Sequence, residues 1–304
     1  MKPTFAQASA SLTPCVPFQH LITKDLTEIP LFELSDRTNH KDALLVLHAT
    51  GFSGCTYRAL ASHLSNRWDV FAIDFRGHGR SKKRSDETFH WVNFAKDVDA
   101  ATKYIKRLGY DKISVFGHSM GAAAAILSLE LGDQDIDKAF LFEPIIFKEP
   151  EDSAPNLDNP LAKLALRRRS SFDSYEAAYD NFTHKEPICR FLSTVVIDYL
   201  LSAFKLAPDG TVSLSCTKED ESLIYAFGGS HGAYHTLDRI SNDVTILFGA
   251  DTDTFDRTHF IDLARRLPKG TYQELKDTGH FAPMTHPEML ANTMIKADHT
   301  NHHP

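Results

Sequence analysis

The sequence predicts an α/β protein built on a mostly parallel sheet. Residues 43–47 form a continuous apolar run, which is typical of a strand buried on both faces of a parallel sheet. Further short β-rich runs at 113–116, 139–142 and 244–248 are separated by segments that include stretches with helical spacing. The run at 113–116 leads into a Gly-x-Ser-x-Gly pattern at 117–121 and then into four consecutive alanines, which indicates a strand, a sharp turn and a helix in succession.

Length and composition limit the possible number of domains and the possible partners. The 304 residues suffice for one large α/β domain with an insertion or for two small domains, and a hydrophobic content of 42% provides an ample core. The formal charge of −7, from 40 acidic and 33 basic residues without a long basic run, argues against a nucleic-acid partner. No apolar stretch reaches the length of a membrane span or a signal peptide, so we expect no membrane-spanning segment.

The four cysteines, Cys15, Cys55, Cys189 and Cys216, are scattered along the chain and have no repeated spacing. This pattern predicts neither a disulfide framework nor a zinc site, and reduced thiols fit a cytoplasmic protein. The three histidines near the C-terminus lie on a polar tail, where an ordered metal site is not expected. We therefore predict no bound metal ion.

The order of elements predicts a core that is interrupted once. We expect the core at residues 18–146 and 243–298, and flexible polar termini at 1–17 and 299–304. Residues 147–242 lack sheet-like alternation and contain prolines and helical stretches, so we interpret them as a helical lid. The expected strands are 18–22, 29–34, 43–47, 70–73, 113–116, 139–142, 244–248 and 271–275.

The Gly-x-Ser-x-Gly pattern places Ser119 where a nucleophile would be presented. A serine on a sharp, strained turn needs neighbours without side chains, because Cβ atoms at Gly117 and Gly121 would crowd the strand and the helix. The N–H groups at the start of the following helix then face whatever the serine attacks. We interpret Ser119 as a catalytic nucleophile rather than as part of a structural turn.

These residues resemble the nucleophile motif of the α/β-hydrolases, and the similarity covers nearly all of the chain. Residues 74–81 are similar to the Asp-x-Arg-Gly-x-Gly-x-Ser turn of that family, and residues 279–283 to its Gly-His-Phe-x-Pro histidine loop. The resemblance implies an α/β-hydrolase fold, in which helices flank a mostly parallel central sheet and a helical lid is inserted before the penultimate core strand. It also implies an oxyanion hole, to which we assign the backbone N–H groups of Phe52 and Met120, and it implies no cofactor.

A serine nucleophile needs a base with a pKa near 7, and histidine fits this need. Among the 16 histidines, His280 is the one at the place in chain order that the family implies, after the last strand. His118 adjoins the nucleophile and is expected to point away from it. We assign His48 and His78 to structural loops and His231 to the lid region.

The acid that orients the histidine has two candidate places. In many relatives it lies three residues beyond the glycine after the strand 244–248, but that position is Thr252, flanked by Asp251 and Asp253. Other relatives place the acid after the preceding core strand, where this chain has Glu143. A glutamate that closes an apolar strand is costly to bury unless it has a partner, so we favour Glu143 and keep Asp253 and Asp251 as alternatives.

The predicted reaction follows from the nucleophile. A serine rather than an aspartate at position 119 favours hydrolysis of a carboxylic ester or thioester through an acyl-enzyme, with a small-molecule acyl substrate and water as the reactants. The alternatives are a carbon–carbon bond hydrolase, a lyase or a cofactor-free peroxidase on the same residues, or a non-catalytic ligand-binding protein on this scaffold. The Arg167–Arg169 run is either a solvated helix face or a contact for a substrate carboxylate or phosphate. The sequence predicts no oligomeric state.

Overall fold

The computed structural model describes residues 3–10, 12–38, 40–132, 135–148 and 154–300, and its centre is an eight-stranded sheet. The strand order is β1-β2-β4-β3-β5-β6-β10-β11, and all neighbours from β4 to β11 pair in parallel. Only β1 and β2 run antiparallel to their neighbours, at one edge. The strands are β1 (Gln19–Ile22), β2 (Glu28–Glu33), β3 (Asp42–Leu47), β4 (Asp69–Ile73), β5 (Lys112–His118), β6 (Lys138–Phe142), β10 (Asp243–Gly249) and β11 (Gly270–Leu275). The predicted mostly parallel sheet is therefore confirmed.

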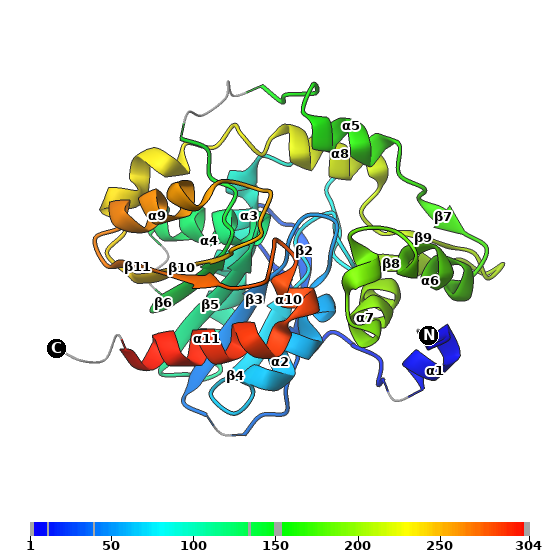
Figure 1. The fold of residues 1–304 in the computed structure, drawn as a ribbon, viewed down its shortest axis with the longest axis horizontal. Coiled ribbons are helices and arrows are strands. Elements are labelled where there is room, and N and C mark those ends of the chain that lie inside the picture. Colours follow the sequence, from blue (N-terminus) through cyan, green and yellow to red (C-terminus); the bar gives the residue numbers. More distant parts are fainter. Residues whose placement is uncertain (1–2, 11, 39, 133–134, 149–153, 301–304) are drawn as a thin grey trace.

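Helices cover both faces of this sheet (Figure 1). Because side chains alternate along a strand, β3 sends Leu45 and Leu47 into one apolar core and Leu44 and Val46 into the other. The first core contains the helices α3 (Trp91–Arg107), α4 (Met120–Glu130) and α9 (Arg257–Arg266). The second contains α2 (Arg58–Leu64) and α11 (Pro287–Thr300).

The segment between β6 and β10 adds no strand to the large sheet in the part of it that the structure describes. We call residues 147–242 the insertion. It carries a small sheet of its own, in the order β7-β9-β8, next to a group of helices. Its main elements are α5 (Pro160–Leu166), β7 (Ser171–Phe172), α6 (Tyr175–Thr183), α7 (Ser193–Ala203), β8 (Phe204–Leu206), β9 (Val212–Leu214), α8 (Lys218–Ala226) and the 3-10 helix η3 (Ala233–Arg239).

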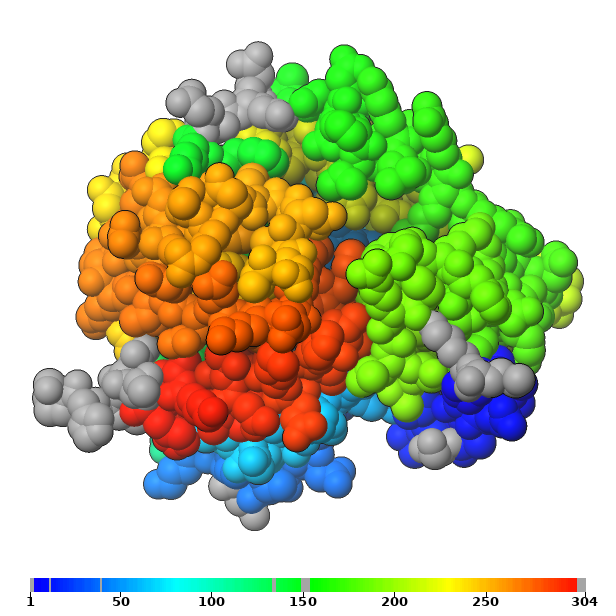
Figure 2. All heavy atoms as spheres, viewed as in Figure 1, coloured from blue at the N-terminus to red at the C-terminus, as the bar shows by residue number. Residues whose placement is uncertain are grey.

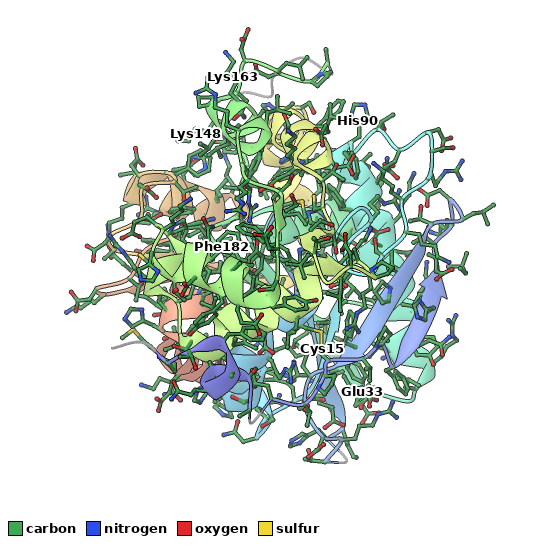
Figure 3. All side chains as sticks on the ribbon, turned by 90° about the vertical axis from the view of Figure 1, so that its right-hand side faces the viewer. Cys15, Glu33, His90, Lys148, Lys163 and Phe182 are labelled. Atoms are coloured by element: carbon green, nitrogen blue, oxygen red, sulfur yellow. A yellow bond between two sulfur atoms is a disulfide. The ribbon has the colours of Figure 1, made fainter. Side chains whose placement is uncertain are left out.

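The described part of the N-terminal segment, which we expect to be flexible, makes specific contacts with the rest of the chain. Helix α1 (Phe5–Ser9) is capped by Thr4, and the Phe5 ring lies 5.9 Å from the ring of Tyr175 in α6. The chain then reaches the core, where Cys15 forms a disulfide with Cys55 (Figure 3). The N-terminal segment therefore joins the insertion to the core. At the other end, α11 continues to residue 300, and residues 301–304 lie outside the described residues.

The Cys15–Cys55 bond corrects the prediction that the cysteines are unpaired thiols. The two residues are 40 positions apart, and Cys55 is fully buried in the 3-10 helix η1 (Gly54–Tyr57). The pair was missed because disulfide partners cannot be deduced from the spacing of cysteines alone. The expectation of a cytoplasmic protein depended on unpaired, reduced thiols, so the bond also removes the basis of that expectation.

Loss of this bond is expected to weaken the fold. A disulfide that closes a loop of this length contributes about 2–4 kcal/mol, largely by restricting the unfolded chain. Cys15→Ser should therefore lower the free energy of unfolding in urea by about that amount. A dithiol reductant should destabilise the wild type in the same way and leave the Cys15→Ser/Cys55→Ser double variant unchanged. Equal reductant sensitivity of both proteins would show that the bond does not form.

Candidate active site

Ser119 lies at the sharp turn between β5 and α4. Its backbone is left-handed, with φ 57° and ψ −115°, a conformation that costs a non-glycine residue about 1–3 kcal/mol. The Ser119 N–H donates to the Phe142 carbonyl over 2.9 Å, which holds the turn against β6. A Cβ on Gly121 would lie 2.2 Å from the Leu47 oxygen, and one on Gly117 would lie 2.5 Å from the Ala122 Cα. The predicted crowding at both glycines is confirmed.

Glu143 and His280 are hydrogen-bonded partners at the carboxyl end of the sheet. Glu143 follows β6 directly, is fully buried and has a left-handed backbone with φ 46°. Its Oε2 lies 2.7 Å from His280 Nδ1. Because a carboxylate accepts, this bond selects the tautomer of the neutral ring in which Nδ1 carries the proton and Nε2 is the acceptor.

Two further groups hold the Glu143 carboxylate. The Gly249 N–H donates to Oε1 over 3.0 Å, and the Thr252 hydroxyl donates to Oε2 over 2.7 Å. Thr252 occupies the place where many relatives carry the acid, although a hydroxyl cannot replace a carboxylate. In the structure its hydroxyl donates to the Glu143 carboxylate. Asp251 and Asp253, the alternative acids, are both exposed.

His118 joins three loops of the site. Its Nε2 donates to the His280 carbonyl over 2.9 Å, so its Nδ1 accepts from the Tyr57 hydroxyl, 2.7 Å away. The Tyr57 oxygen in turn accepts from the Ala49 N–H over 3.0 Å. Burial holds the pKa of His118 well below its ordinary value of 6.5, so the ring stays neutral. As predicted, His118 has structural partners, and its hydrogen bond to the His280 carbonyl joins the Ser119 turn to the loop that carries His280.

The His280 ring lies close to the nucleophile turn but is not bonded to Ser119. Its centroid is 4.7 Å from that of His118, the residue before Ser119. Within the described residues, its hydrogen bonds run through Nδ1, to Glu143 and to Thr254 Oγ1 at 3.1 Å, and none reaches the Ser119 hydroxyl. Hydrogen bonds between a nucleophile and its base are often long in the free enzyme and tighten when substrate binds.

The two predicted oxyanion donors differ in their surroundings. The Met120 N–H belongs to the first turn of α4, where N–H groups have no acceptor within the helix. The Phe52 N–H donates to the Ala49 carbonyl over 3.2 Å, within the loop after β3. The Thr50 hydroxyl, two residues before Phe52, contacts the Met120 sulfur at 3.4 Å. The two donors therefore lie on touching segments, and one of them already has an acceptor.

Aromatic side chains from the core and the insertion meet beside these residues. The Phe52 ring lies 6.1 Å from that of Phe191, 5.3 Å from that of Tyr199 and 6.2 Å from that of Phe281. Figure 2 shows a hollow between the insertion, in green, and the loop after β10, in orange, with blue atoms of the N-terminal third at its floor. Phe281, one of these rings, is the neighbour of His280, so the aromatic cluster adjoins the Glu143–His280 pair.

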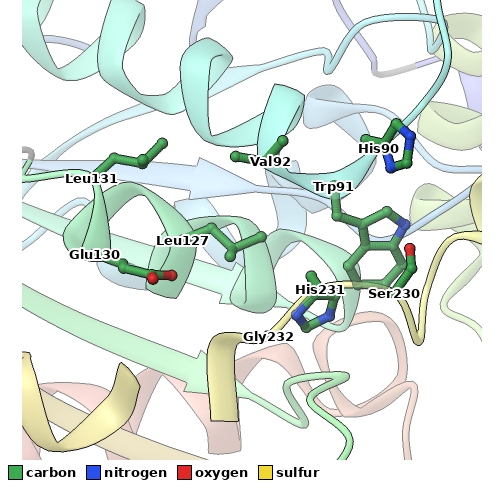
Figure 4. Close-up of a pocket in the computed structure, with 9 residues that line it drawn as sticks. All are labelled: His90, Trp91, Val92, Leu127, Glu130, Leu131, Ser230, His231 and Gly232. Atoms are coloured by element: carbon green, nitrogen blue, oxygen red, sulfur yellow. The ribbon is translucent and has the colours of Figure 1, made fainter. Parts of the chain in front are cut away.

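A separate cavity of about 270 Å³ lies between α3, α4 and the loop before η3 (Figure 4). It is lined by Trp91, Leu127 and His231, among others, and by none of the predicted catalytic residues. His231 stacks on Trp91 with centroids 5.2 Å apart, and its Nε2 donates to the Ile145 carbonyl. Burial lowers the pKa of His231 to about 4, so it is a neutral packed histidine.

Within the described residues, no group of three or more His, Cys, Asp or Glu side chains is arranged to hold a metal ion. None of the helices that the structure describes is long and apolar enough to cross a lipid bilayer.

The sheet order, the strained serine turn and the Glu143–His280 pair are together typical of one family. Residues 44–293 match the model of the alpha/beta hydrolase family, and the chain therefore belongs to it. The crystal structure of E-2-(acetamidomethylene)succinate hydrolase superposes with a TM-score of 0.75 at 15% identity, covering 93% of this chain and 98% of that one. At this identity the likeness concerns the fold alone.

Relatives in sequence match only part of the chain. A serine hydrolase-like protein of Danio rerio is 27% identical over 180 residues, which are 57% of this chain and 54% of that protein. A probable protein phosphatase methylesterase 1 of Caenorhabditis elegans is 30% identical over 150 residues, 49% of this chain and 40% of that protein. The chain thus spans about half the length of these relatives or less.

Proposed function

We propose that the chain is a serine hydrolase that cleaves a carboxylic ester or thioester through an acyl-enzyme. Ser119 attacks the carbonyl carbon, and His280 Nε2 takes the hydroxyl proton and later passes it to the leaving group. Glu143 keeps the imidazole in the tautomer that leaves Nε2 free and stabilises the imidazolium. Water then releases the acid by the reverse proton path, and no cofactor takes part.

The N–H groups of Met120 and Phe52 are the proposed donors to the oxyanion. Such donors act on the charge that develops in the transition state, and each is worth about 10²–10³ in rate. The Phe52 N–H makes only a long, 3.2 Å bond to Ala49, so a charged oxygen can replace the carbonyl as its acceptor. We further propose that the insertion acts as a lid, because its residues Phe191 and Tyr199 pack on Phe52.

One observation carries this proposal. A buried carboxylate that accepts from Nδ1 of a histidine is what the acid–base half of a serine-hydrolase triad requires, and the His280 ring lies 4.7 Å from that of His118, the residue before the strained Ser119 turn. The relative described as a methylesterase acts on an ester by its name, which supports ester chemistry over the carbon–carbon, lyase and peroxidase alternatives.

A covalent probe tests the proposal directly. A fluorophosphonate reacts only with a serine that has an active base, so the purified wild type should incorporate one label, located at Ser119 by mass spectrometry. The same preparation should hydrolyse p-nitrophenyl acetate, and labelling should abolish this activity. A protein that stays unlabelled, or that is labelled elsewhere, would instead be a non-catalytic member of the family.

A further inference from the structure

The fold separates the three arginines of the Arg167–Arg169 run. The two outer arginines are exposed, whereas Arg168 contacts α7 and α8, and only 23% of its side chain is exposed. Its Nη1 donates to both carboxylate oxygens of Glu221, over 3.0 and 2.9 Å, and its Nη2 donates to the Tyr199 hydroxyl. Arg168 therefore points into the protein, whereas Arg167 and Arg169 point to solvent.

This cluster lies against the loop that carries the proposed oxyanion donor Phe52. A Cβ atom on Gly51, the residue before Phe52, would lie 2.8 Å from Glu221 Oε1 and 3.5 Å from Arg168 Nη1. The ring of Tyr199, the third member of the cluster, is 5.3 Å from that of Phe52. The guanidinium therefore lies beside the loop that carries the proposed donor, on the side to which Gly51 would direct a Cβ atom.

The guanidinium of Arg168 has donors to spare. An arginine carries five N–H groups in a fixed plane, and within the described residues Arg168 uses only Nη1 and Nη2. Arg76 shows what a saturated guanidinium looks like in this chain: only 1% of it is exposed, and it is paired with the carboxylates of Asp25, Glu87 and Asp97. Arg168 has one carboxylate partner, so its remaining N–H groups can donate to a second carboxylate.

Resting on the proposed function, we infer that Arg168 is a specificity-determining residue that binds a carboxylate group of the substrate close to the scissile carbonyl. The substrate class is then the half-esters or half-thioesters of short dicarboxylic acids. Glu221 holds the guanidinium in place while the site is empty, because a half-buried cation without a counter-charge is costly. A planar guanidinium can bind the incoming carboxylate through two parallel N–H···O bonds.

The inference is tested by inhibition with a matched pair of compounds. Glutarate carries two carboxylates, and glutaramide is its uncharged diamide; both are tested as inhibitors of p-nitrophenyl acetate hydrolysis. Glutarate should compete with substrate, and Arg168→Gln should raise its inhibition constant about 10- to 100-fold, since charge-assisted hydrogen bonds are lost. The inhibition constant of glutaramide should stay unchanged. Arg167→Gln, an exposed neighbour, is the control and should alter neither value.

Glu221→Gln separates recognition from a structural role. If Arg168 binds a carboxylate, removing the competing charge of Glu221 should lower the inhibition constant of glutarate. If the pair only ties the segment after α5 to α8, both single variants should weaken inhibition by glutarate and glutaramide alike. The Arg168→Gln/Glu221→Gln double variant has no unpaired charge in the cluster, and it replaces Arg168→Gln should that variant fold poorly.

Failure of this inference can be told apart from failure of the proposed function. Fluorophosphonate labelling of Ser119 is read in the same samples, with and without glutarate. A wild type that is labelled but shows no preference for glutarate over glutaramide overturns the role of Arg168 alone, as does an equal effect of Arg168→Gln and Arg167→Gln. A wild type that is not labelled overturns the proposed function and this inference with it.

Discussion

Replacing Ser119 with alanine is expected to lower kcat for an activated ester by about 10³-fold or more, with a small change in KM. The hydroxyl is the proposed attacking atom, so its loss removes the covalent step, while the groups that bind the ester remain. The residual rate should come from the oxyanion donors, which can still polarise a carbonyl toward water. The measurement is steady-state hydrolysis of p-nitrophenyl acetate by purified protein.

Two controls make this result specific. The midpoint temperature of thermal unfolding of Ser119→Ala should equal that of the wild type or be slightly higher. The alanine has no hydroxyl group that would need a hydrogen-bond partner in the buried turn. Ser62→Ala, on the exposed side of α2, should keep the wild-type rate. If Ser119→Ala turns over the ester as fast as the wild type, the nucleophile is another group and the proposed mechanism is wrong.

The sheet could be predicted because its strands carry a strong local signal. Buried parallel strands are apolar on both faces, so the runs at 43–47 and 244–248 stand out without any knowledge of their partners. The Cys15–Cys55 bond and the packing of Phe5 on Tyr175 have no such signal. They join segments that are far apart in the chain, and only the folded insertion and core bring those segments together.

The residues of the candidate site also fall into those that the sequence could predict and those that it could not. Ser119 and Glu143 each come directly after a strand, so position along the chain was enough to make them candidates. Thr252 carries no charge, and its contact with Glu143 depends on the loop after β10 folding back toward β6. Arg168 has the same residue type as both of its neighbours, so only the path of the chain after α5 distinguishes it.

The second large effect is expected at Glu143. Glu143→Gln should lower kcat by about 10⁴-fold, the loss seen when a triad acid is replaced by its amide. A glutamine cannot reproduce the present hydrogen bonds, because Oε1 accepts from the Gly249 N–H while Oε2 accepts from His280 and Thr252. If the amide NH₂ faces His280, Nδ1 must accept, the proton moves to Nε2, and the base is lost. If the NH₂ faces Gly249, two donors meet in a buried site.

The alternative acids provide the matched comparison. Asp251→Asn and Asp253→Asn change exposed carboxylates, so their rates should stay within about twofold of the wild type. Thr252→Val, which removes one donor to Glu143 but keeps the charge, should lie between these variants and Glu143→Gln. A collapse of the rate in Asp251→Asn or Asp253→Asn, with Glu143→Gln still active, would mean that the loop after β10 rearranges during catalysis to bring another carboxylate to His280. The order of these rates therefore identifies the acid, because each variant changes a single contact of the imidazole or none.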